Sequence, residues 1–185
     1  MTAYEELGPL ARLVGTWEGD KGNDKAPDDD PSQVEHNLYR EQMVFEPTGQ
    51  VDNHSQTLFG LRYRTTAWRI GQDDSFHEEL GYWMWDKERE TVIRCFMVPR
   101  GVNVLAGGKV KPDANSFELN ASLGSPTYGI CSNEFLNEEF KTESYWLKVT
   151  FNNDGSFSYE EDTRLRIKGN KELFHHTDAN TLFKK

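Results

Sequence analysis

Two adjacent histidines near the C-terminus are the side chains of this sequence best suited to chemistry. His175 and His176 lie in the segment LFHHTDANTLF, whose composition predicts a β-strand. Successive side chains of a strand point to opposite faces, so only one of the two imidazoles can point inward. His176 would share a face with Phe174, Asp178, Asn180 and Leu182, and His175 would share the other face with Leu173, Thr177, Ala179, Thr181 and Phe183. Neither face is cleanly apolar.

A third histidine, His77, lies in the segment SFHEELGYWMW. In a strand it would share a face with Glu79, Gly81, Trp83 and Trp85, which places an imidazole among large rings. A neutral imidazole on an apolar wall is suited to bind haem iron, and a neighbour can orient its second nitrogen. The alternative is a histidine that only forms a hydrogen bond at a strand end or rim, and the residue pattern alone favours this alternative.

Other classes of site find little support. The loop DKGNDKAPDDDP lacks the oxygen spacing of a calcium loop, and HEELG lacks the second histidine of a HExxH zinc site. The sequence contains no GxSxG elbow, phosphate-binding GxxxxGKS/T loop or GxGxxG turn. The neighbouring carboxylates in the pairs Glu78–Glu79 and Glu160–Glu161 must point opposite ways on a strand, so we expect most acidic side chains to lie on solvated faces.

Composition indicates a single domain over residues 1–185. The net charge of −10, without a basic patch, excludes nucleic acid and anionic membrane surfaces as partners and leaves a small-molecule ligand. The N-terminus lacks a secretory signal and no apolar segment is long enough to span a bilayer, so we expect a cytoplasmic protein, either a monomer or a homodimer. Two cysteines, Cys95 and Cys131, predict free buried thiols rather than a disulfide framework.

The pattern along the chain predicts an all-β fold. A short helix is expected over residues 3–13, around a Gly-Pro break, and a loop from about residue 20 to residue 33. Alternating segments follow, separated by the turn sequences EPTGQ, IGQDDS, DKERE, PRG, KPDAN, NNDGS and KGNKE. Short connections favour a roughly ten-stranded antiparallel up-and-down β-barrel over a sandwich, which needs long crossovers.

Several stretches, in order, resemble the nitrobindin family of haem-binding β-barrels, which are similar in architecture to fatty-acid-binding proteins and lipocalins. They are GTWEG at 15–19, YREQMVFEPTG at 39–49, FHEELGYW at 76–83, FMVPRGVNVLAGG at 96–108 and HHTDANTLFKK at the C-terminus. These correspond to the family's GxWxGxG signature, its Y-x-E-E strand, its HxExG(Y/F) stretch, its HPxG junction and its closing HHxxAxLxR.

The resemblance implies a barrel that holds haem b, with iron bound by a histidine of the last strand. It further implies NO binding to ferrous haem and isomerisation of peroxynitrite to nitrate at ferric haem, and the question of an enzymatic role stays open. The cofactor-binding residues it implies are His176 as the metal ligand, His175 in reserve, His77 on the far side of the cavity, and Trp17 at the barrel floor.

Two spacings depart from the family pattern. Gly22 comes one position late in GTWEGDKG, and Leu182 follows His176 one residue further on than the family's leucine. A β-bulge could absorb an extra residue. Two alternatives stay open beside the haem protein: a metal-free barrel that carries a lipophilic small molecule, and a barrel whose interior is filled by its own rings.

Overall fold

The computed structural model describes residues 4–28, 30 and 33–185, which are mostly β-structure. Two helices and eleven strands make up the described chain. In order they are the 3-10 helix η1 (Glu5–Leu13), β1 (Gly15–Pro27), β2 (Val34–Asn53), β3 (Gln56–Arg69), β4 (Ser75–Asp86), β5 (Thr91–Val98), β6 (Val102–Lys109), β7 (Ser116–Ser122), β8 (Ile130–Ser132), the helix α1 (Glu134–Glu139), β9 (Phe140–Phe151), β10 (Phe157–Ile167) and β11 (Phe174–Lys184).

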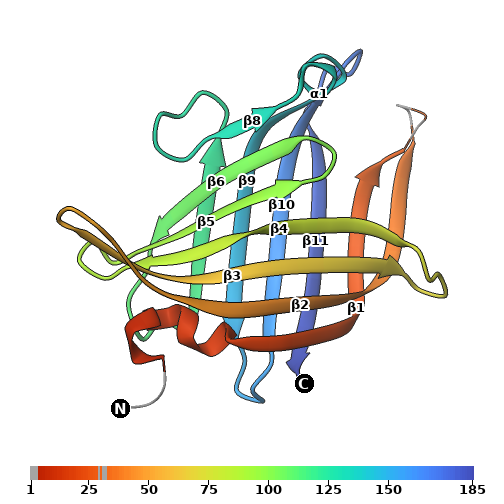
Figure 1. The fold of residues 1–185 in the computed structure, drawn as a ribbon. Coiled ribbons are helices and arrows are strands. Elements are labelled where there is room, and N and C mark those ends of the chain that lie inside the picture. Colours follow the sequence, from red (N-terminus) through yellow and green to blue (C-terminus); the bar gives the residue numbers. More distant parts are fainter. Residues whose placement is uncertain (1–3, 29, 31–32) are drawn as a thin grey trace.

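The strands close into one antiparallel barrel (Figure 1). Hydrogen-bonded neighbours follow the order β5-β4-β3-β2-β1-β11-β10-β9-β7-β6, and β5 also pairs with β6, which completes the ring. Within the described residues ten strands therefore form the wall, and β8 is an additional strand paired with β6. The all-β, roughly ten-stranded barrel predicted from the sequence is confirmed.

The up-and-down order is interrupted once, between β7 and β9. There the chain runs through residues 123–139, which contain β8 and α1 and which the sequence pattern did not predict. β6 pairs with β7 at Gly107 and Asn120, while β8 pairs with β6 further along, from Val102 to Val104. The excursion thus places a short strand and a helix beside the upper ends of β6 and β9 (Figure 1).

The N-terminal helix η1 closes one end of the barrel. Leu7, Leu10 and Leu13 are buried against the core, and Gly8 kinks the helix with a φ of 55°. A Cβ at Gly8 would lie 2.5 Å from the Trp85 indole, so the close approach requires glycine. The predicted short helix is confirmed, although residue 3 of the expected range lies outside the described residues. Neither helix of the described chain is long and apolar enough to cross a membrane.

Two strands are longer than the sequence predicted. β1 continues to Pro27, through the first part of the expected loop, whose positions 29, 31 and 32 lie outside the described residues. β2 continues through EPTGQ to Asn53, because the register shift between Pro47 and Gly49 is a bulge rather than a turn. The turn lies later, at His54, whose φ is 53°. A bulge lets a strand keep pairing around a proline, which has no N–H to donate.

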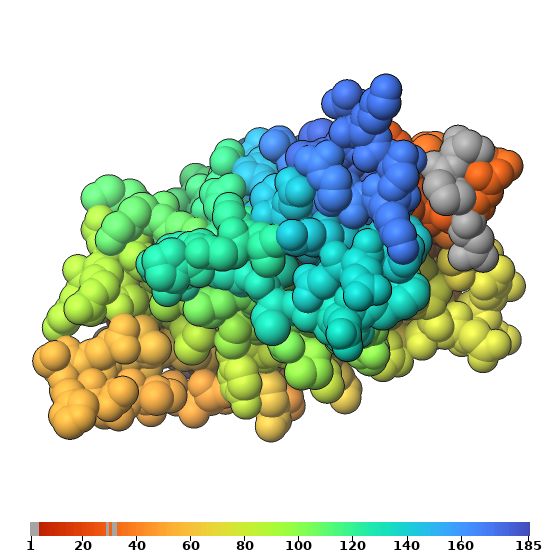
Figure 2. Space-filling model, turned by 90° about the horizontal axis from the view of Figure 1, so that it is seen from above, coloured from red at the N-terminus to blue at the C-terminus, as the bar shows by residue number. Residues whose placement is uncertain are grey.

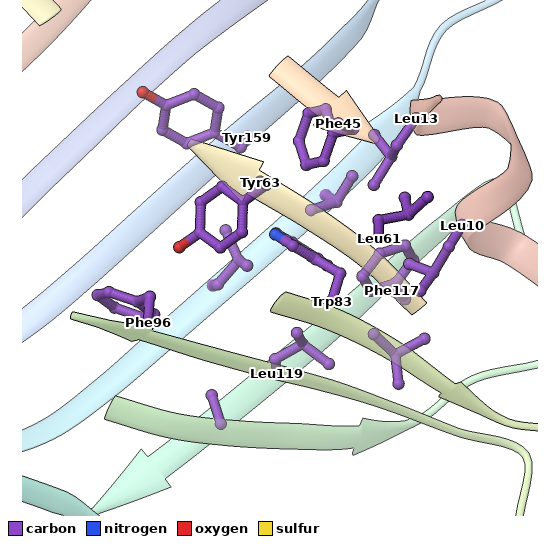
Figure 3. Packing of buried hydrophobic residues seen from close by; sticks show 14 of the residues in the cluster. Leu10, Leu13, Phe45, Leu61, Tyr63, Trp83, Phe96, Phe117, Leu119 and Tyr159 are labelled. Atoms are coloured by element: carbon purple, nitrogen blue, oxygen red, sulfur yellow. The ribbon is translucent and has the colours of Figure 1, made fainter. Parts of the chain in front are cut away.

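The half of the barrel next to η1 is packed with aromatic and aliphatic side chains. Trp83 lies between Tyr63 and Phe117, with Leu10 and Leu13 reaching in from the helix (Figure 3). The ring centroids of Trp83 and Phe117 are 6.3 Å apart and those of Trp17 and Phe157 are 4.9 Å apart, both edge to face. We call this region the closed half.

The two thiols lie outside this core. Both cysteines are free, as predicted, but Cys131 is exposed and Cys95 is only partly buried. The expectation that both are buried is therefore wrong, because both lie on strands that face solvent on one side.

Candidate functional site

A cavity of about 470 Å³ occupies the half of the barrel away from η1, which we call the open half. This volume lies within the range of roughly 300–1,000 Å³ typical of small-molecule sites. Seen from above, residues 168–173 (blue) lie beside the end of β1 and the start of β2 (orange) (Figure 2). One part of the lining is apolar and includes Phe76, Phe96, Val98, Leu136, Phe140 and Leu165. The other part is ionisable and includes Asp24, Glu41, Glu79, Arg94, Glu161 and Asp178.

His176 lies on the cavity wall. It shares the inward face of β11 with the buried Asn180 and Leu182, and β11 pairs with β10 without a register shift from Phe174 to Leu182. The Nε2 atom of His176 is 2.8 Å from Oδ1 of Asp24 on β1, and 36% of the side chain remains exposed. An irregularity of the kind that absorbs an extra residue lies in β1, where the pairing with β2 shifts between Gly19 and Gly22, and not in the pairing of β11 with β10. His176 is thus the C-terminal imidazole that the cavity can reach.

His175 lies on the outer face of the same strand. Its Nδ1 atom is 2.9 Å from Oδ2 of Asp162 on β10, and 49% of its side chain is exposed. The two neighbours therefore form matching histidine–aspartate pairs on opposite faces of the barrel wall. His175, the second candidate for the iron ligand, therefore does not line the cavity.

Trp17 belongs to the closed half rather than to the cavity lining. Its side chain is 3% exposed, and its indole N–H donates to the Leu13 carbonyl at 2.6 Å. This places Trp17 at the barrel floor, where the sequence put it, but among packed rings that do not border the cavity.

A buried ionic network forms the floor of the cavity. His77 lies 3.3 Å from Oε1 of Glu79, and Oε2 of Glu79 lies 2.6 Å from a guanidinium nitrogen of Arg94. Arg94 extends from β5 across the barrel, and one of its guanidinium nitrogens lies 2.5 Å from Oε1 of Glu161 on β10. The hydroxyl of Tyr145 also accepts from Arg94. Two cations and two carboxylates alternate in this network, which separates the cavity from the closed half.

The protonation of the network follows from its contacts. Burial alone would lower the pKa of His77, but the hydrogen bond and charge of Glu79, with the charges of Asp178 and Glu161, raise it to about 9. Burial alone would raise the pKa of Glu79, but the charge of Arg94 and the contact with His77 lower it to about 2. At neutral pH His77 is therefore an imidazolium, which has no lone pair for a metal ion.

A second polar chain crosses the inward faces of β2, β10 and β11. The hydroxyl of Tyr39 donates to Asp178 and lies 2.7 Å from the hydroxyl of Tyr159, which donates to Glu41 at 2.8 Å. Burial raises the pKa of Glu41 to about 7, against the hydrogen bonds from Thr65, Tyr159 and Asn180. Burial and the charges of Glu161 and Glu41 hold the pKa of Asp178 well above its usual range. Burial therefore raises the pKa values of both carboxyl groups on this side of the cavity.

The lining can hold a haem group. His176 supplies a reachable imidazole, and the apolar part of the wall supplies the contact surface that a flat macrocycle needs. Among the described residues, no group of three or more His, Cys, Asp or Glu side chains is arranged to hold a bare metal ion.

Sequence reasoning missed most of the ionic floor. It assigned acidic residues to solvated faces, whereas Glu41 is 5% exposed and Glu79 is 6% exposed. A signal was present in TVIRCFMV, where Arg94 shares a face with Val92 and Phe96. A charged residue flanked at positions i±2 by buried apolar residues must itself point inward, and must then find a partner there.

Comparisons with known proteins support the same architecture. The chain is similar to the solved structure described as "Crystal Structure of Rv2717c from M. tuberculosis", with 20% sequence identity, a TM-score of 0.69 and 97% of each chain covered. At this identity the likeness shows the fold alone. A comparison with curated proteins found no significant match. The model of the family described as "THAP4-like, heme-binding beta-barrel domain" matches residues 6–184, nearly the whole chain. The resemblance drawn from the sequence is confirmed, and the chain belongs to this haem-binding β-barrel family.

Proposed function

We propose that this protein binds haem b in the cavity, with His176 as the iron ligand. The observation that carries the proposal is that His176 lies on the cavity wall while His175, one residue earlier, points out of the barrel. Membership of a haem-binding family supports the cofactor. His77 is held by Glu79 at the floor of the cavity, with Nε2 3.3 Å from Oε1, and we assign it to the polar lining.

The finer activities are part of the same proposal. Bound haem would supply a site for NO in its ferrous state and for isomerisation of peroxynitrite to nitrate in its ferric state. The residues of this chain would bind and orient the macrocycle, and the ionic floor of Glu79, Arg94 and Glu161 would separate it from the closed half. A cytoplasmic location, expected from the sequence, belongs to this proposal as well.

A titration with haemin tests the proposal. We expect the wild type and the His175→Ala variant to give the same Soret band at one haem per chain, and His176→Ala to lose it or to bind far more weakly. The two variants remove the same group from neighbouring positions, so the comparison separates ligation from effects on β11. Circular dichroism spectra of the two haem-free variants check that both are folded.

Equal spectra for wild type and His176→Ala would contradict axial ligation at this residue. If no Soret band shift occurs at all, the metal-free carrier becomes the better reading. The apolar part of the wall supports a carrier of a lipophilic molecule, whereas the buried ionic floor does not.

A further inference from the structure

Asp24 has a fixed position at the cavity wall. It is 5% exposed and lies opposite Asn37 on β2 and Asp178 on β11. Its Oδ2 atom accepts from the side-chain N–H of Asn37 at 2.8 Å. The side-chain oxygen of Asn37, Oδ1, in turn accepts from Nε of Arg69 at 2.7 Å. Only Oδ1 is left for His176, at 2.8 Å. The carboxylate is therefore held from behind and directed at the imidazole.

This contact determines which nitrogen of His176 carries the proton. A carboxylate can only accept, so Nε2 must be the donor, and the lone pair of the neutral ring lies on Nδ1. Nε2 lies on the side of the ring away from Cβ, so it is the nitrogen that can approach a flat macrocycle without a collision with the main chain. Asp24 thus holds the nitrogen that haem iron would need.

We propose that Asp24 competes with haem iron for Nε2 of His176 and makes haem binding exchangeable. The inference rests on the proposed function, because it takes His176 as the ligand. If His176 held haem, Nε2 would give up its hydrogen bond to Oδ1 of Asp24 and the ring would carry its proton on Nδ1, so no net proton would be released. When haem leaves, Asp24 takes the imidazole back. The protein then acts as a reversible haem carrier.

The size of the effect follows from the lost bond. Loss of a hydrogen bond to a charged group typically changes an equilibrium constant by roughly tenfold to hundredfold. Replacement of the carboxylate by an amide leaves a neutral hydrogen bond of about half the strength. The haem-free state of D24N is therefore less stabilised by this contact than that of the wild type, and its haem affinity should be about tenfold higher.

The outer pair provides a matched control. Asp162 holds His175 on the far side of the same two strands, at 2.9 Å, so D162N removes the same charge next to a histidine that does not reach the cavity. Asn37 still finds an acceptor in D24N, because the amide oxygen can take the place of Oδ2, and the new amide N–H then donates to the lone pair of Nε2 in the other tautomer of His176. D24A serves as a second variant that removes the contact completely.

Haem transfer to excess apomyoglobin measures the exchange. We expect D24N to release haem about tenfold more slowly than the wild type, D24A to release it at least as slowly as D24N because it removes the contact completely, and D162N to match the wild type. In the haem-free protein, ¹⁵N NMR should show a protected Nε2 proton on His176 in wild type and D162N, and its loss in D24A. Equal or faster release from D24N would overturn the proposal.

The two proposals fail in different ways. If His176→Ala binds haem like the wild type, the proposed function is wrong whatever Asp24 does. If His176→Ala loses haem while D24N and D24A release it at the wild-type rate, haem ligation stands and the competition by Asp24 is wrong.

Discussion

The closed half and the open half of the barrel are built from the same ten strands but use them differently. In the closed half the inward positions carry Phe45, Leu61, Trp83 and similar side chains, which pack against one another in the core. In the open half the same strands present Glu41, Glu79 and other polar groups around a volume of about 470 Å³. Because apolar burial drives folding and buried charges oppose it, the closed half stabilises the fold and the open half is free to bind a ligand.

The boundary between the halves is the guanidinium of Arg94. Arg94 is 2% exposed, and its guanidinium contacts two carboxylates. The Cζ atom lies 5.1 Å from the ring centroid of Trp83 and 4.3 Å from that of Phe96. Arginine suits this place because its planar fork can bind several acceptors and still stack on aromatic faces. The network lets charged groups meet the aromatic core without leaving an unpaired charge.

The largest effect is expected from removal of this boundary. R94M would leave Glu161 without a cation and Glu79 with His77 alone, and breaking a buried ion pair in this way typically costs about 3–5 kcal/mol of unfolding free energy. The loss, measured by urea denaturation, should be smaller at pH 5 than at pH 8, because the carboxyl groups can then take up protons. R62M is the control, since Arg62 forms an exposed pair with Glu46 and its loss should cost less than about 1 kcal/mol. Similar losses for the two variants would mean that Arg94 does not hold the halves together.

A smaller effect should distinguish the two halves directly. Leu61 is completely buried in the closed half, whereas Leu165 lines the cavity. We expect L61A to lose about 3 kcal/mol, because it leaves a new enclosed void. L165A should lose about 1–2 kcal/mol, because it enlarges an existing space and forfeits mainly transfer free energy. Both values come from chemical denaturation, and an equal loss would show that the open half is as tightly packed as the closed half.

The sequence predicted the closed half better than the open half. Alternation and turn residues are local signals, and they were sufficient for the barrel, for η1 and for the opposite faces of His175 and His176. They could not decide which of these faces points inward, because Asp178 and Asn180 make the inner face polar. That choice depends on partners far away in the chain: Asp24 is 152 residues from His176. The strand β8 was missed for a similar reason, since its three residues are fixed by pairing with β6 rather than by a pattern of their own.

The smallest effect for each step of the experiment, about 1 kcal/mol per pH unit, concerns the proton held by Glu41. Because its pKa is raised to about 7 from an ordinary 4.5, the folded chain keeps this proton between these pH values while the unfolded chain loses it. The free energy of unfolding should therefore fall as pH rises through this window, by about 1 kcal/mol per pH unit, and level off above pH 7. E41Q removes this ionisation and can keep the contacts with Thr65, Tyr159 and Asn180, so its advantage over the wild type should grow from pH 5 to pH 7.

Urea denaturation at several pH values measures this slope, and E88Q is the control because Glu88 is exposed. If wild type and E41Q respond to pH in parallel, Glu41 is already ionised in the folded protein. The polar side of the open half would then carry a negative charge at neutral pH. That charge would be buried beside Asp178. The open half would then differ from the apolar closed half by being anionic at neutral pH.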